Sequence, residues 1–529
     1  MNWYFDQPRN LLIYEHLNSI LTQYIPEAVV ADNRYTIIPR NLRNSQILRY
    51  LNYPVPPIMS EYNWPAPPGF KPYESQITSA NFMVLHRRCF NLSDMGVGKT
   101  LATLWAADWL MKQHENFRAL IVCPLSIMQR VWADAIFKNF LGHRSFEILH
   151  GDAERRTKGL AKPADFYIVN FDGISVGAHT RKRLELDGFC KTLAERSDIK
   201  LAIVDEASAY KDAQTLRHRI SRQVFGKKDY LWLLTGTPTP NAPTDAYGLA
   251  KLVNNSYGKS FSTFQSETMT KITNFKWIPQ KDGYQKARAM LSPSIRYDIS
   301  DVWDAPPETT QQREVELTAA QKKMMADFKR DLQVTVKSGT AITAINEGAL
   351  RNKFLQVAMG AVYDSDHKEH VIDCEPRLRE AENVLESTGR KVVIFVGLTS
   401  VLNLLNRRLS KRWKGVVING HVSAKQRAEN IRLFAEDDSI KYVLADPGAT
   451  AHGINEFALV ADTCLWYSPS EKNELYLQGN RRVNRPGQRF PTTIVQLVAT
   501  PLEREIYKRL ETNTSLQGVL LEMVRKGEL

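Results

Sequence analysis

Short apolar runs that alternate with helical stretches constrain the fold of this chain more than any other feature of its sequence. The runs occupy residues 119–123, 166–169, 201–204, 230–234, 391–396, 416–418, 442–444, 464–466 and 493–497. A strand that is apolar throughout is buried on both faces, and its alternation with helices is typical of a parallel sheet covered on both sides. From about residue 241 to residue 375 the pattern is helical instead. We therefore expect an α/β fold with parallel-sheet domains at 72–250 and 376–529 and a helical insertion at 251–375.

Length, charge and cysteine content narrow the class of protein. At 529 residues the chain is too long for a single core. Lys and Arg (70) outnumber Asp and Glu (57), and the net charge of +13 favours a polyanionic partner such as nucleic acid, although an inert basic surface accounts for it equally well. Five scattered cysteines without a Cys-x-x-Cys pair disfavour zinc and a disulfide framework. Neither a signal peptide nor a membrane span is recognisable, so we expect a cytoplasmic protein.

The first 71 residues differ in character from the rest. Residues 10–24 have the spacing of a short amphipathic helix, and residues 35–38 read as a strand. Seven prolines lie between residues 53 and 72, a density that blocks both helix and sheet, so 53–71 is predicted to be an extended linker. Residues 1–52 then form a small α+β module, which is either an accessory domain that contacts the substrate or a packing appendage.

The segment 93–100, with the sequence SDMGVGKT, follows an apolar run and precedes a helical pattern. Backbone N–H groups of such a loop, together with the N-terminus of the next helix, cradle the phosphates of a nucleotide. Lys99 would reach the β- and γ-phosphates, and the hydroxyl of Thr100 would ligate Mg²⁺. The strict pattern has Gly where Ser93 stands, and an ordinary glycine turn is the alternative interpretation.

Two carboxylates, Asp205 and Glu206, come directly after the apolar run 201–204. Ligands bind at the carboxyl edge of a parallel sheet, where Asp205 would hold Mg²⁺ and Glu206 would orient or deprotonate the attacking water. The alternative is an acidic pair that only begins a loop. Residues 478–488 are rich in arginine, which is either a solvated basic turn or a source of cations for phosphoryl transfer. Cations supplied from a second domain would couple domain closure to hydrolysis.

Taken together, these segments resemble the Swi/Snf-type branch of the superfamily 2 helicase-like DNA translocases. The similar segments, in the family's order, are 94–100 (motif I), Pro124 and its neighbours (Ia), 205–208 (II), 235–238 (III), 391–397 (IV), 453–455 with 461–462 (V) and 478–488 (VI). The resemblance covers about residues 72–500. It implies two tandem RecA-like domains, the use of ATP with Mg²⁺, and a compact bacterial or phage-type member of the branch.

The resemblance also implies the site residues. Contacts to ATP are implied for Gln76, Asp94, Met95, Gly96, Val97, Gly98, Lys99, Thr100, Gly453 and Asn455. Catalysis is implied for Lys99, Asp205, Glu206, Arg482 and Arg485, with Arg485 as the arginine finger and Mg²⁺ on Thr100 and Asp205. The chain departs from the usual pattern where Ser208 and Asn484 stand for His and where Arg481 stands for Asp.

The function implied by the resemblance is a DNA-stimulated ATPase that translocates on double-stranded or branched DNA in replication, recombination or repair. Most of its DNA contacts would be to phosphates. One alternative is a helicase that separates the strands of DNA or RNA. The other is a binding module that has kept the fold without catalysis, which the presence of Lys99, Asp205, Glu206 and Arg485 disfavours.

Overall fold

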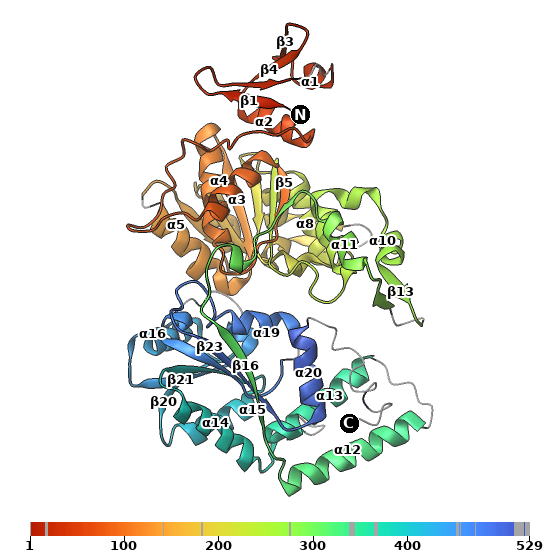
Figure 1. The fold of residues 1–529 in the computed structure, drawn as a ribbon, viewed down its shortest axis with the longest axis vertical. Helices are drawn as coiled ribbons and strands as arrows, with labels where there is room; N and C mark the ends of the chain where they lie inside the picture. Colours follow the sequence, from red (N-terminus) through yellow and green to blue (C-terminus); the bar gives the residue numbers. More distant parts are fainter. Residues whose placement is uncertain are drawn as a thin grey trace. The chain divides into compact units, whose positions relative to one another are not determined.

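The computed structural model describes residues 2–15, 19–140, 142–180, 184–273, 277–337, 344–363, 369–450, 454, 456–470, 472–512 and 523. The chain forms two units, Met1–Val302 and Trp303–Leu529 (Figure 1). The first unit holds a small antiparallel sheet and a seven-stranded parallel sheet, and the second holds a six-stranded parallel sheet. The prediction of an α/β fold with two parallel-sheet domains is thereby confirmed.

The parallel sheet of the first unit has the strand order β15-β5-β12-β11-β6-β8-β7. Its strands are β5 (Arg88–Asn91), β6 (Arg118–Cys123), β7 (Phe146–Leu149), β8 (Phe166–Asn170), β11 (Ile199–Val204), β12 (Tyr230–Leu234) and β15 (Ser294–Ile295). Successive residues of β6 alternate between two buried clusters, Ala119 and Ile121 in one and Leu120 and Val122 in the other. The apolar run therefore serves two cores, one on each face of the sheet.

Helices cover both faces of this sheet. One cluster includes α3 (Glu74–Leu85), α4 (Lys99–Gln113), η2 (Met128–Ala133) and α5 (Asp134–Asn139). The other includes α6 (Ala153–Ala161), α7 (Gly188–Glu195), α8 (Leu216–Gly226), α9 (Ala246–Val253), α10 (Phe261–Thr268) and α11 (Gly283–Met290). Short elements lie between them: η1 (Leu125–Ile127), η3 (Gly173–Ser175), η4 (Ala207–Tyr210), η5 (Pro243–Asp245), η6 (Asn255–Gly258), η7 (Ile299–Asp301) and the hairpins β9–β10 (Ala178–Thr180, Leu184–Leu186) and β13–β14 (Met269–Lys271, Trp277–Pro279).

The N-terminal module is a four-stranded antiparallel sheet with two helices. Its elements are β1 (Trp3–Asp6), β2 (Leu11–Tyr14), α1 (Ser19–Tyr24), β3 (Val29–Ala31), β4 (Tyr35–Pro39) and α2 (Leu42–Tyr50). The prediction of a single helix over 10–24 is wrong. Leu11–Tyr14 pairs with both β1 and β4, because four consecutive apolar residues suit a central strand as well as a helix. The strand predicted at 35–38 is β4.

The module and the proline-rich segment both pack against the first parallel-sheet domain. Gln46 in α2 donates through Nε2 to the carbonyl of Val84 at 2.9 Å and to the hydroxyl of Tyr230 at 3.0 Å. Within the proline-rich segment, Met59 is buried, and the carbonyl of Pro65 accepts from Nε1 of Trp105 at 2.6 Å. Residues 53–71 form turns and irregular backbone without helix or strand, and they lie on the core through Ile58, Met59 and Tyr62.

The second unit has the strand order β16-β23-β22-β19-β21-β20, all parallel. Its strands are β16 (Glu308–Glu314), β19 (Lys391–Phe395), β20 (Lys414–Ile418), β21 (Ile440–Ala445), β22 (Ala461–Trp466) and β23 (Thr492–Val498). Its other elements are α12 (Ala319–Lys337), α13 (Ala344–Met359), hairpin β17–β18 (Ala361–Tyr363, Glu369–Val371), α14 (Glu375–Ser387), α15 (Thr399–Leu409), α16 (Ala424–Glu436), α17 (Pro447–Thr450), α18 (Phe457–Val460), α19 (Asn473–Asn480) and α20 (Pro501–Glu511). A fully buried ion pair of 2.7 Å between Arg377 and Glu503 joins α14 to α20.

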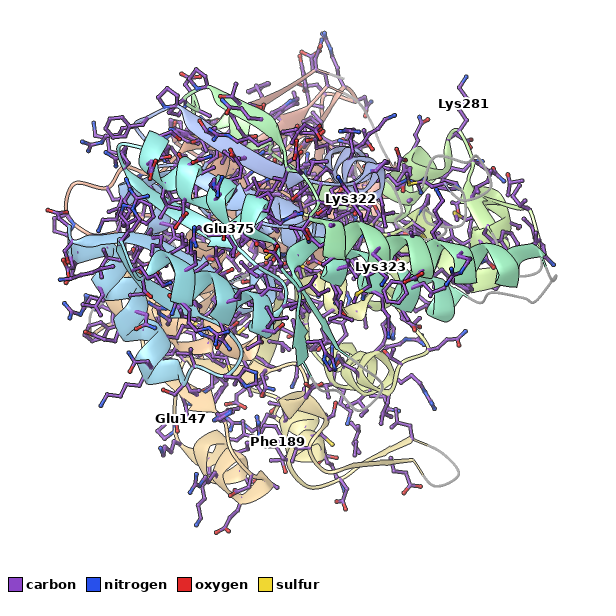
Figure 2. The ribbon with its side chains drawn as sticks, turned by 90° about the horizontal axis from the view of Figure 1, so that it is seen from below. Glu147, Phe189, Lys281, Lys322, Lys323 and Glu375 are labelled. Atoms are coloured by element: carbon purple, nitrogen blue, oxygen red, sulfur yellow. The ribbon has the colours of Figure 1, made fainter. Side chains whose placement is uncertain are left out.

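The segment predicted as a helical insertion, 251–375, contains more than helices. Ser294–Ile295 adds an edge strand to the first sheet, and Glu308–Glu314 adds one to the second. The sequence of β16 is polar throughout because the strand is exposed at an edge, so it lacked the apolar run that marks the other strands. Lys322 and Lys323 of α12 and Lys281 of the first unit extend into solvent (Figure 2). Among the described helices, none combines the length and the apolar character that a membrane crossing requires.

Candidate active site

The glycine-containing loop connects the end of β5 to the start of α4. Gly96 and Gly98 have φ angles of 92° and 82°, in the left-handed region that other residues rarely adopt. Helix α4 begins at Lys99, directly after Gly98. Because the first N–H groups of a helix have no partner within the helix, this loop and helix end together suit an anion such as a phosphate.

Lys99 folds over this loop. Its Nζ donates to the carbonyl oxygens of Ser93 at 2.7 Å and Asp94 at 2.8 Å. Burial lowers the pKa of Lys99, and the negative charges of Glu206 and Asp205 oppose that shift. The ammonium group therefore lies within the electrostatic reach of the acidic pair, as a phosphate-binding lysine beside a metal ligand requires.

Gln76 supports the loop from the side. Its Oε1 accepts from the backbone N–H of Tyr73 at 3.0 Å, and its Nε2 donates to the carbonyl of Gly98 at 3.2 Å. A Cβ atom on Gly98 would lie 2.1 Å from Nε2 of Gln76. The backbone angle therefore favours glycine at position 98, and any larger residue would also displace the side chain of Gln76.

The acidic pair lies at the carboxyl end of β11, between β6 and β12. Oδ1 of Asp205 accepts from the N–H of Glu206 at 3.0 Å, and Oδ2 accepts from Nε1 of Trp132 at 3.0 Å. Burial and the charge of Glu206 raise the pKa of Asp205 to about 6, while Lys99 and the bond from Trp132 lower it. The carboxylate of Asp205 is thus oriented by two donors before any ligand binds.

Trp132 is a site residue that the sequence reasoning missed. It lies in the π-helix η2 and is fully buried. The available signal was its position, because Trp132 follows Pro124, in the segment that resembles motif Ia, by eight residues. A tryptophan that is buried also needs an acceptor for its indole N–H.

A distant segment fastens the loop to the sheet edge. The N–H of Asp94 donates to the carbonyl of Tyr297 at 2.9 Å, and the N–H of Tyr297 donates to Oγ of Ser93 at 3.1 Å. Oδ2 of Asp94 accepts from the N–H of Ile299 at 3.3 Å. Ser93, which departs from the strict glycine pattern, therefore has a structural task that glycine could not perform. No local pattern signals a bond between residues 204 positions apart.

The two arginines predicted in the second unit lie together. NH1 of Arg482 and NH1 of Arg485 both donate to the carbonyl of Ile454, at 3.1 and 3.2 Å. Burial lowers the pKa of Arg485, and the charge of Glu456 opposes this shift. Of the other predicted ATP contacts in this unit, Gly453 and Asn455 lie outside the described residues.

The residues present fit a magnesium ion held with a nucleotide. Within the described ranges, no group of three or more His, Cys, Asp or Glu side chains could enclose a metal ion. Mg²⁺ needs no such group, because it is commonly held by one or two protein oxygens together with substrate phosphates and water. Asp205 carries such an oxygen at the sheet edge, and the hydroxyl of Thr100, in the first turn of α4, is the second oxygen that the sequence predicts.

The sequence of this chain matches a known protein family and several known proteins. The model of the SNF2-related domain matches residues 75–378. Protein p41 of Acyrthosiphon pisum secondary endosymbiont phage 1 is 24% identical, over 86% of this chain and 98% of its own length. The ATP-dependent DNA helicase DDM1 of Arabidopsis thaliana is 24% identical over 81% of this chain, and chromodomain-helicase-DNA-binding protein 9 of Homo sapiens is 24% identical over 86%.

The share of each relative's length that this chain covers differs between the relatives. It covers 58% of the plant protein and 16% of the human protein, so these relatives contain large regions that it does not match. Among solved structures, a Sulfolobus solfataricus SWI2/SNF2 ATPase core in complex with dsDNA matches 88% of this chain and 95% of its own, at 21% identity and a TM-score of 0.38.

Proposed function

The chain belongs to the SNF2-related domain family, and from this membership we infer that it hydrolyses ATP in order to move along double-stranded DNA. The observation that supports hydrolysis is the arrangement at one sheet edge. The phosphate loop at the end of β5 and the acidic pair at the end of β11 both lie at the carboxyl edge of the parallel sheet, with only β12 between the two strands, and the charges of Asp205 and Glu206 act on the buried ammonium group of Lys99. A nucleotide phosphate bound by the loop would lie beside both carboxylates.

Each residue then has a task in phosphoryl transfer. Lys99 and the N–H groups of the loop bind the β- and γ-phosphates, and Glu206 orients the attacking water. Thr100 and Asp205 hold Mg²⁺, which supplies positive charge next to the phosphates when it is bound. Arg482 and Arg485 supply further positive charge to the transferred phosphoryl group once the nucleotide is enclosed.

The choice of DNA as the polymer rests on the family and on charge. The plant relative is named a DNA helicase and the human relative a DNA-binding protein. The net charge of +13 favours a polyanion. We therefore place the protein's action on double-stranded or branched DNA, in replication, recombination or repair, with contacts mainly to phosphates.

The test is phosphate release by the full chain with linear duplex, single-stranded DNA, forked DNA and RNA. We expect the duplex and the fork to stimulate hydrolysis most, and Lys99→Ala to abolish it. Displacement of the third strand from a triplex without unwinding of a tailed duplex would support translocation. Efficient unwinding of the tailed duplex would establish a strand-separating helicase instead, and the absence of stimulation by any nucleic acid would contradict the proposal.

A further inference from the structure

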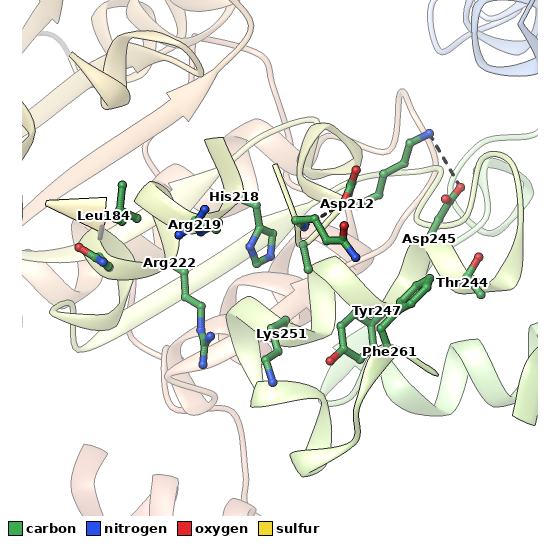
Figure 3. A pocket seen from close by; sticks show the side chains of 14 residues that line it. Leu184, Asp212, His218, Arg219, Arg222, Thr244, Asp245, Tyr247, Lys251 and Phe261 are labelled. Atoms are coloured by element: carbon green, nitrogen blue, oxygen red, sulfur yellow. Dashed lines mark hydrogen bonds and ion pairs between the residues drawn. The ribbon is translucent and has the colours of Figure 1, made fainter. Parts of the chain in front are cut away.

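A second pocket lies in the first unit, away from the phosphate loop. It has a volume of about 930 Å³ and is formed mainly by α8, α9 and the turns that follow β11 and β12. Four Lys and Arg side chains line it: Lys211 from the turn after β11, Arg219 and Arg222 from α8, and Lys251 from α9. Figure 3 shows the charged ends of Arg222 and Lys251 pointing to the same side of the pocket, with Tyr247 and Phe261 beside Lys251. We call this pocket the α8–α9 groove.

The carboxylates of the groove are already engaged. Asp245 pairs with Lys211 at 3.9 Å and accepts from the N–H of Asn241 at 2.8 Å. Asp212 accepts from the N–H of Gln214 at 2.8 Å. Across the part of the chain that the structure describes, no carboxylate lies within ion-pair distance of Arg219, Arg222 or Lys251. Arg222 donates instead to the neutral Oδ1 of Asn255 at 3.1 Å, and Nζ of Lys251 lies 5.9 Å from the centre of the Tyr247 ring. The groove therefore has a net positive charge at its α8–α9 side.

The groove is held in shape by backbone contacts. Nε2 of the buried His218 in α8 donates to the carbonyl of Gly248 in α9 at 2.8 Å. A Cβ atom on Gly248 would lie 2.1 Å from the carbonyl oxygen of Lys211, so α9 packs directly on the turn that follows the acidic pair. The cations are thus displayed on two helices whose separation is fixed, which lowers the cost of ordering them around a ligand.

The positive charges of Arg222 and Lys251 repel each other. Burial, together with the positive charge of Arg222, lowers the pKa of Lys251. An anion between the two side chains would relieve this repulsion.

We propose that the α8–α9 groove binds the phosphodiester backbone of nucleic acid, as a contact separate from the ATP site. Arg219 and Arg222 are three residues apart, about 4.5 Å along the axis of α8, and Lys251 lies on the neighbouring helix. Cations distributed in this way suit successive phosphates of a polymer better than one small anion. The choice of nucleic acid over an acidic peptide rests on the proposed function. Contacts to phosphates alone carry no sequence preference.

The test compares two triple variants of the full chain. Arg219→Gln/Arg222→Gln/Lys251→Gln removes the three cations of α8 and α9. Arg155→Gln/Lys158→Gln/Lys162→Gln removes three cations of and next to α6, whose side chains are 78%, 74% and 63% exposed, and it changes the net charge equally. The affinity for a fluorescent linear duplex is measured by anisotropy over a series of salt concentrations.

The groove variant is expected to bind the duplex at least about tenfold more weakly, with a slope of log affinity against log salt reduced by about 2 to 3. The control variant should bind the duplex more tightly than the groove variant, and its slope of log affinity against log salt should be closer to that of the wild type. ATP hydrolysis without DNA should be unchanged in both variants, because none of the six residues lies in the ATP site. Equal losses in the two variants would overturn the proposal. A changed oligomeric state in sedimentation with unchanged DNA affinity would also overturn it, in favour of a protein contact.

A second measurement needs no substitution. A duplex that carries photoreactive groups on its phosphates is cross-linked to the wild-type chain, and the modified peptides are identified by mass spectrometry. Cross-links within residues 216–226 and 246–253 support the groove, and cross-links only elsewhere overturn it. If wild-type hydrolysis is not stimulated by any nucleic acid, the proposed function has failed. If nucleic acid stimulates hydrolysis but no cross-link falls in the α8–α9 groove, the proposed groove contact is wrong and the proposed function still stands.

Discussion

The indole N–H of Trp132 donates to Oδ2 of Asp205 across 3.0 Å, from a π-helical turn to the end of a central strand. The bond restricts the rotation of a carboxylate that we assign to magnesium. Groups that orient a metal ligand commonly change metal affinity or activity by about 10- to 100-fold when they are removed.

Trp132→Phe keeps an aromatic ring but removes this donor. We expect the Mg²⁺ concentration for half-maximal ATP hydrolysis to rise roughly tenfold. Trp105→Phe is the matched control, because it removes an indole bond of 2.6 Å to the carbonyl of Pro65, outside the site. The control should lower the melting temperature without changing the magnesium requirement. A wild-type magnesium requirement in Trp132→Phe would show that the bond does not orient Asp205.

Gly98→Ala should damage the phosphate loop for two reasons, the φ angle of +82° and the 2.1 Å approach to Nε2 of Gln76. Gly69→Ala separates these effects, because Gly69 has φ +83° and no atom within 4 Å of its added Cβ. Both variants should lose stability, on the order of 1 kcal/mol for the backbone alone. Only Gly98→Ala should also weaken ATP binding, measured by titration with a fluorescent nucleotide. Equal nucleotide affinity in the two variants would contradict the role given to Gln76.

Protonation of His86 should contribute to the pH dependence of stability. Burial, with a smaller contribution from the charge of Arg49, lowers the pKa of His86 from 6.5 to about 4. Between these two values the unfolded chain binds a proton that the folded chain does not. Stability from neutral His86 is therefore complete above about pH 6.5 and is lost as the pH falls toward 4.

His86→Phe should flatten the fall of the melting temperature over this pH window. The ring of Phe82, 4.3 Å from that of His86, can still pack against the substituted side chain. His150→Gln, at an exposed position, should leave the pH profile unchanged. A steep profile that persists in His86→Phe would assign the acid sensitivity to other groups.

Arg485→Ala should lower the turnover of ATP by about 10³-fold or more, the range typical of an arginine finger. Nucleotide affinity should change little, because the phosphate loop and the acidic pair belong to the other unit. Arg489→Ala, at an exposed arginine directly after the segment 478–488, should retain activity. If Arg485→Ala hydrolyses ATP normally, the finger is another residue, and Arg482, which shares the carbonyl of Ile454, is the next to substitute.

The sequence predicted those parts of the fold that depend on local pattern. The buried strands are continuous apolar runs, and Asp205 and Glu206 follow one of them directly. Leu11–Tyr14 was mistaken for helix, because a run of four apolar residues carries no period of its own. Trp132 and Tyr297 reach the site through contacts between residues 73 and 204 positions apart, and such pairings leave no mark on neighbouring residues.

Gln46 makes the N-terminal module difficult to remove. Besides its bonds to Val84 and Tyr230, its Oε1 accepts from Nε of Arg87 at 3.2 Å. Deletion of residues 1–52 would remove Gln46 and leave the carbonyl of Val84, the hydroxyl of Tyr230 and the guanidinium group of Arg87 without this shared partner. It would also expose the surface on which the module packs. Loss of activity in the deletion variant would therefore indicate damage to the fold, and it would not by itself show that the module contacts the substrate. A cleaner dissection would exchange exposed side chains of the module one at a time and leave Gln46 in place.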